Sequence, residues 1–82
     1  MNSIINYVKT KENLEVILKK INEIYEDKIT KEKTKNIILM NMTIISFFIL
    51  KLEQYINNNE IMEDEIYFEI TNLLNEINNF VK

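Results

Sequence analysis

The fold of this chain depends on one apolar stretch, residues 37–52, which reads IILMNMTIISFFILKL. Its first fourteen residues carry no charge, and a helix of that length measures about 21 Å. The hydrocarbon core of a membrane is roughly 30 Å thick, so the uncharged segment is too short to cross it. Asn41, Thr43 and Ser46 also interrupt the apolar run. We therefore interpret the stretch as the core helix of a small soluble bundle, with no transmembrane span expected.

The composition predicts one helical domain from an AT-rich genome. The chain has 82 residues, and 46% of them are hydrophobic, which is enough for a core and too much for a disordered chain. It contains sixteen Ile, thirteen Asn and ten Lys but no Ala, Gly, Pro or Arg. Ala is the best helix former, so its absence reflects codon usage rather than structure. Since the chain has no Cys and its N-terminus lacks a signal-peptide pattern, we expect a cytoplasmic protein.

Caps and periodicity predict three helices. The first begins at Ser3 or at Thr10, which is a candidate N-cap, and Thr30 is the candidate N-cap of the second. Residues 57–59 are three Asn, a residue that tolerates the left-handed conformation at helix ends. Short connections make consecutive helices antiparallel, so we predict an all-α fold: a compact antiparallel three-helix bundle with a central, broadly apolar second helix. The helices are expected at about residues 3–27 or 10–27, 31–56 and 60–81.

The first and third helices each carry one apolar stripe, with polar residues on the opposite side, as amphipathic helices do. The first stripe is Leu14, Ile17, Leu18, Ile21, Ile24 and Tyr25. The third is Met62, Ile66, Ile70, Leu73, Ile77 and Phe80.

The second helix is apolar on nearly every side. Its predicted core face consists of Ile38, Met42, Ile45, Ile49, Leu52 and Ile56, flanked by Ile37, Ile44, Phe48 and Tyr55. Four large apolar residues point away from that face: Leu39, Met40, Phe47 and Leu50. Either the neighbouring helices straddle the second helix widely enough to bury them, or they form a surface for self-association or partner binding. We favour the second interpretation, which includes a homodimer.

The third helix carries the negative charge. Four of its six acidic residues crowd its predicted first turns, where the helix dipole favours them. Glu65, Glu69 and Glu76 line one flank at helical spacing. They are expected to be solvated, to pair with lysines of the first helix, or to meet a basic groove on another protein.

The sequence argues against catalysis and cofactor binding. It has no His or Cys and no glycine-rich loop, so we expect no enzyme activity, no cofactor and no metal site. The acidic balance and the lack of Arg disfavour direct nucleic-acid binding. By elimination, we expect a small non-enzymatic protein-binding module. A stoichiometric inhibitor or adaptor encoded by a phage or mobile element is the concrete version. The alternatives are a membrane-associated immunity or holin-like protein that uses residues 37–52, and a self-assembling structural subunit.

Overall fold

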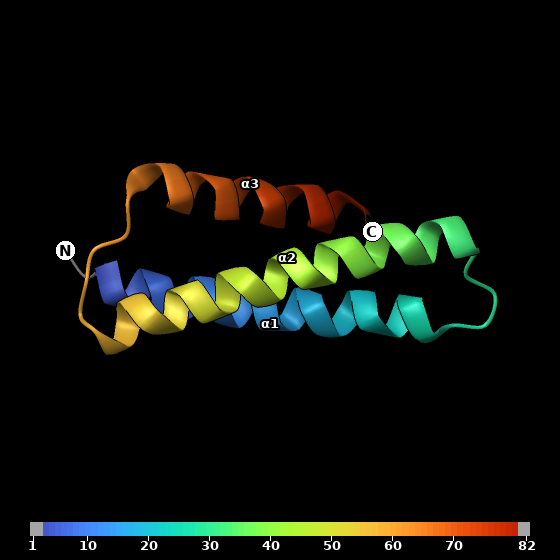
Figure 1. Cartoon of the computed structure of the whole chain (residues 1–82), viewed down its shortest axis with the longest axis horizontal. Coiled ribbons are helices and arrows are strands. Elements are labelled where there is room, and N and C mark those ends of the chain that lie inside the picture. The colour runs from blue at the N-terminus through green and yellow to red at the C-terminus, as the bar shows by residue number, and fades with distance from the viewer. Residues whose placement is uncertain (1–2, 81–82) are drawn as a thin grey trace.

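The chain forms a bundle of three helices, as predicted. The computed structural model describes the backbone of residues 3–80 and the side chains of residues 6–80. The helices are α1 (Ser3–Glu26), α2 (Glu32–Asn57) and α3 (Asp64–Phe80), and no strand occurs in this part of the chain. Successive helices run in opposite directions along a rod with extents of 44 × 19 × 16 Å (Figure 1).

The core follows a seven-residue spacing on each helix, which is the repeat that keeps one side of a helix facing its neighbours. Ile38, Ile45 and Leu52 of α2 are each 0% exposed. The remaining buried apolar side chains are Tyr7, Leu14, Ile17, Ile21, Met62, Ile70 and Ile77. The predicted core face of α2 is therefore confirmed at its centre, and Met42, Ile49 and Ile56 are partly buried beside it.

The sequence predicts a central second helix, but it is α1 rather than α2 that makes the close backbone contacts with both other helices. The α1–α2 pair packs most extensively, the α1–α3 pair less so, and the α2–α3 pair least. The polar contacts that hold α3 also reach α1. The Thr10 Oγ1 atom lies 3.3 Å from the Tyr67 hydroxyl, and the backbone N–H of Met62 donates to the Tyr7 hydroxyl at 2.7 Å. These contacts hold α3 against α1. The contribution of α2 to the core is its buried side chains Ile38, Ile45 and Leu52.

The start of α1 is at Ser3, so residues 3–9 belong to the helix. Thr10 is not an N-cap but an interior residue that is 7% exposed. Its hydroxyl donates to the Asn6 carbonyl oxygen at 2.8 Å, which satisfies the buried polar group within the helix.

The connection between α1 and α2 differs from the prediction at Thr30. The Thr30 hydroxyl donates to the Ile24 carbonyl oxygen at 2.7 Å, so it satisfies the C-terminus of α1. The N-cap of α2 is Lys31, whose side chain makes no capping hydrogen bond. Both helix ends leave backbone groups without partners, and Thr30 lies within reach of both. The Thr30 hydroxyl bonds to the carbonyl near the end of α1 and does not cap α2.

In the connection between α2 and α3, the helix break at residues 57–59 is as predicted, but α3 begins later in the chain than predicted. Asn59 has a φ of 54°, and the N–H groups of Asn59 and Glu60 donate to the carbonyls of Ile56 and Tyr55. This is the Schellman motif, with Asn in place of the usual Gly. Because these bonds turn the chain away, the predicted helix start at Glu60 is wrong and α3 begins at Asp64.

Met62 precedes α3, yet it is 3% exposed, so its predicted place in the core holds although its predicted place in the helix does not. The predicted end of the third helix at Val81 lies outside the described residues.

Candidate functional site

The side of α2 that faces away from α1 and α3 is the main candidate site. We call it the outer face, and it consists of Ile37, Leu39, Met40, Ile44, Phe47 and Leu50, which are between 37% and 60% exposed. The structure therefore places all four apolar site residues predicted from the sequence on the surface of one helix. They are not buried by the neighbouring helices.

Sequence reasoning missed two members of the outer face. The sequence predicts that Ile37 and Ile44 flank the core, but they are 41% and 37% exposed. At 100° per residue they lie about 80–100° from the centre of the buried stripe, which is the boundary between the two sides. Because α3 approaches α2 less closely than α1 does, this boundary stays open to solvent.

Phe47 lies at the middle of the outer face. Its ring centroid is 5.9 Å from that of Phe48, and the Lys51 Nζ lies 5.9 Å from the Phe47 ring. The ring is nevertheless 54% exposed. The nearby Thr43 hydroxyl donates to the Leu39 carbonyl at 3.0 Å, so it does not require a partner on the surface. The outer face thus presents apolar side chains around an aromatic centre.

The three predicted acidic site residues lie on α3. Glu65, Glu69 and Glu76 are exposed. The ion pair found among residues 6–80 joins Lys11 and Glu53 at 3.3 Å, between α1 and α2. In the described part of the chain, α3 therefore makes no ion pair with lysines of α1, and its acidic side faces solvent.

An apolar residue interrupts this acidic side. Phe68 is 67% exposed in a shallow depression that it shares with Asp64, Glu65 and Glu69. Ile61, just before the helix, is 79% exposed. The acidic and apolar candidates predicted from the sequence therefore form two separate surfaces on two helices.

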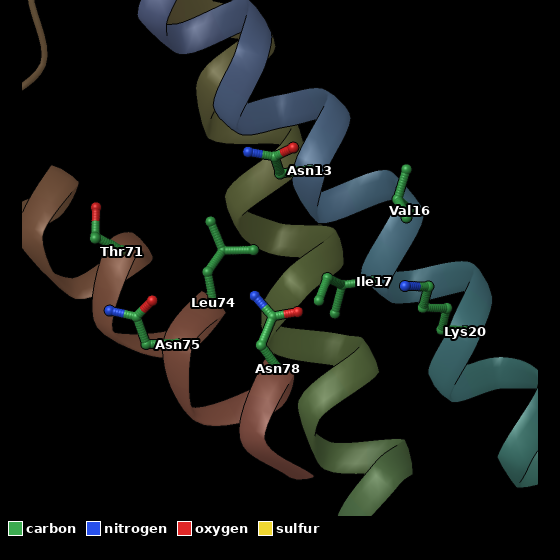
Figure 2. A pocket seen from close by; sticks show the side chains of 8 residues that line it. All are labelled: Asn13, Val16, Ile17, Lys20, Thr71, Leu74, Asn75 and Asn78. Carbon is green, nitrogen blue, oxygen red and sulfur yellow. The ribbon is translucent and has the colours of Figure 1, made fainter. Parts of the chain in front are cut away.

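A cleft of about 390 Å³ lies between α1 and α3 (Figure 2). Figure 2 shows Ile17 and Leu74 between the two helices, with polar side chains around them. Its lining residues are Asn13, Val16, Ile17, Lys20, Thr71, Leu74, Asn75 and Asn78. The lining supplies amides, one hydroxyl and one amine, a set without a carboxylate or imidazole to act as a general base.

Two further findings bear on the class of protein. Within the described residues, no group of three or more Asp, Glu, His or Cys side chains could hold a metal ion. In the same part of the chain one helix, α2, is long and apolar enough to cross a membrane by length and composition. Core helices of soluble proteins pass this test as well, but only 17% of the residues in its most apolar window are buried. The exposed outer face contributes to this low value, and Met42, Phe48 and Ile49 on the core side are only partly buried.

Comparisons with known proteins give no relative from which a function could be inferred: no family model, no curated protein and no solved structure matches the chain.

Proposed function

We propose that this chain is a non-enzymatic protein-binding module that acts as a stoichiometric inhibitor or adaptor of a larger protein in the cytoplasm. The observation that carries the proposal is the outer face of α2. Contiguous apolar patches of several hundred Å² on a small soluble domain mark interaction sites, because leaving them in water is unfavourable.

The size of the outer face supports the proposal. A large apolar side chain presents roughly 200 Å² when uncovered, so six that are about half exposed present about 600 Å². This is at the upper end of the largest patch on a typical monomer. At about 25 cal/mol per Å², covering it would release on the order of 10 kcal/mol or more before the costs of association. A gain of this size is comparable to the cost of association, which is about 4–15 kcal/mol.

The acidic side of α3 is the second surface that we propose for contact with the larger protein. Its exposed carboxylates surround Phe68, a combination that suits a basic groove with an apolar pocket. A groove that normally takes nucleic acid has this chemistry. An inhibitor encoded by a phage or mobile element, directed at a bacterial enzyme or defence system, is the concrete form of the proposal.

Affinity capture from a lysate of the source cells tests the proposal. The bait is the full chain, its Phe47→Asp and Glu69→Lys variants, and two matched controls on α1. Val16→Asp introduces the same charge at a side chain that is 53% exposed, and Glu15→Lys makes the same reversal at an exposed position. We expect one larger protein at near-equal stoichiometry that is lost with at least one of the first two variants and kept by both controls. Recovery of the same proteins by all five baits would contradict the proposal.

The low burial of α2 favours one second candidate, a membrane-associated immunity or holin-like protein. In that case residues 37–52 would insert into lipid. Fractionation of cells that produce the untagged chain separates the two candidates. We expect recovery in the soluble fraction, whereas quantitative recovery with membranes that resists high salt would favour the second candidate.

A further inference from the structure

We infer that the outer face of α2 binds the outer face of a second copy, with the two α2 helices antiparallel in a two-fold symmetric dimer. This inference rests on the proposal that the outer face is a protein interface. It assigns that face to a second copy, so the larger partner would bind the acidic side of α3.

The area of the outer face matches what a stable dimer needs. A specific interface buries about 800 Å² on each partner. The apolar residues supply about 600 Å² of that. The exposed polar residues beside them, Asn36, Thr43 and Gln54, would supply much of the remainder. The outer face is about as wide as one helix, so one helix of a second copy is wide enough to cover it.

The outer face also has the repeat of a helix–helix seam. Met40 and Phe47 are seven residues apart, as are Thr43 and Leu50, and together they alternate in steps of three and four. This is the spacing that lets two helices pack along their length. α2 therefore has two such seams: the buried one faces α1 and α3, and the exposed one has no partner within the described chain.

The antiparallel register is self-complementary. It places Met40 opposite Leu50 of the second copy and Thr43 opposite Phe47 of the second copy. Asn36 then faces Gln54 of the second copy, so amide meets amide where the apolar segment ends. Ile44 and Ser46 lie near the two-fold axis and face their own counterparts.

A parallel pair is less favourable. It aligns the two helix dipoles in the same direction, whereas an antiparallel pair opposes them. It also sets Lys33, which is seven residues before Met40, against the same Lys33 of the second copy. In the antiparallel register Lys33 faces Asn57 of the second copy, an uncharged residue.

The dimer leaves the acidic side of α3 exposed on both copies. A larger partner with a basic groove would then bind there, and the dimer would present this side twice. Different variants should therefore disrupt the two kinds of binding. Phe47→Asp should weaken self-association, and Glu69→Lys should weaken binding of the larger partner.

Sedimentation equilibrium of the untagged chain over a wide concentration range tests the dimer. We expect a mass twice the 9.9 kDa of one chain that falls to one chain on dilution. Phe47→Asp should weaken association by roughly 30-fold or more, since buried aromatic anchors dominate interface energies. Val16→Asp should associate like the parent. Circular dichroism of each variant verifies that the helices remain.

Thiol cross-linking tests the register, because the chain has no natural cysteine. Ser46→Cys should cross-link to itself with a short bismaleimide. Asn36→Cys should not, because the two Asn36 positions are separated by about 27 Å of helix in the antiparallel dimer. Mixing Asn36→Cys with Gln54→Cys should produce the cross-linked pair. Efficient cross-linking of Asn36→Cys to itself would overturn the antiparallel arrangement.

The outcomes separate this inference from the proposed function. If the parent chain is monomeric at every concentration and Phe47→Asp loses a captured larger protein, the dimer is wrong and the protein-binding function stands. If the parent binds phosphatidylcholine–phosphatidylglycerol vesicles through Phe47 and remains monomeric without them, both are wrong. If the parent chain is monomeric at every concentration and Phe47→Asp loses its helical signal while Val16→Asp keeps it, the outer face belongs to the core. The dimer and the part of the proposed function that rests on the outer face are then both wrong.

Discussion

The two sides of α2 are made of the same kinds of residue and have opposite environments. On the inner side, Ile38, Ile45 and Leu52 are 0% exposed. On the outer side, Met40 is 60% exposed and Leu50 is 59% exposed. The difference comes from the neighbours. α1 and α3 each offer one apolar stripe, and two stripes can cover one side of a third helix but not its full circumference. Burial in this protein is thus decided by what the other helices can cover.

The largest loss of stability is expected when a buried side chain on the inner side of α2 is shortened. Ile45→Ala should lower the free energy of unfolding by about 2–5 kcal/mol, because the cavity cannot be filled by its closely packed neighbours. Leu50→Ala should change it by no more than about 0.5 kcal/mol when measured at concentrations where the chain is monomeric. Urea denaturation followed by circular dichroism gives both values. Equal losses for the two variants would mean that the inner and outer sides have been assigned wrongly.

The next effect concerns what holds α3 over the inner side. Tyr7→Phe removes the acceptor of the Met62 N–H, which is a buried hydrogen bond, and should cost about 1–3 kcal/mol. Tyr55→Phe is the control, since the Tyr55 ring lies 6.5 Å from that of Tyr7 and its hydroxyl makes no hydrogen bond among the described residues. Hydrogen exchange should show faster exchange in α3 than in α1 and α2 for Tyr7→Phe alone. Uniform acceleration across all three helices would contradict a local role.

The turn that leads into α3 should have a smaller effect. Asn59 has a positive φ, and Asn59→Ala should cost about 1–2 kcal/mol because a Cβ is disfavoured in that conformation. Asn59→Gly should stay within about 0.5 kcal/mol of the parent. Thermal melts of the two variants should therefore differ. Matching melts would indicate that the positive φ at Asn59 does not limit the stability of the protein.

The smallest effect is expected at the edge between α1 and α2. Glu53→Gln breaks the ion pair with Lys11, which is partly exposed on both sides, and should cost about 0.2–1 kcal/mol at low salt. The loss should diminish at high salt, where the pair is screened in the parent as well. Glu15→Gln, an exposed position on α1, controls for the change of net charge. A salt-independent loss would show that Glu53 contributes by packing instead.

Periodicity predicted most of the fold, because the seven-residue spacing of Ile38, Ile45 and Leu52 places these apolar residues on one side of the helix. The sequence left two interpretations open for Leu39 and Phe47, burial by widely spaced neighbours or exposure on a surface. The limited area of two neighbouring helices favoured exposure, which the structure shows. The candidate site was therefore largely visible in the sequence.

The errors lie where local rules allow two partners. Thr30 can donate to the end of α1 or cap the start of α2, and only the path of the connection decides between them. The delayed start of α3 has another origin: the bonds that the Asn59 and Glu60 N–H groups donate to the end of α2 turn the chain before the next helix begins. Met62 is held by the Tyr7 hydroxyl, a contact between distant parts of the chain that no local pattern indicates. Ile37 and Ile44 were missed because they lie at the boundary of the buried stripe, where a small difference in helix packing decides their exposure.

The most direct test of the claim that α2 has a core side and a binding side is the unfolding transition of Phe47→Asp. A carboxylate at a surface position changes stability little, whereas an unpaired buried carboxylate costs several kcal/mol, which so small a domain cannot lose and remain folded. We predict a monomer that keeps its helical signal and unfolds cooperatively, with a free energy of unfolding within about 1 kcal/mol of the dissociated parent chain. Loss of the cooperative transition in Phe47→Asp, with Val16→Asp still folded, would contradict the account.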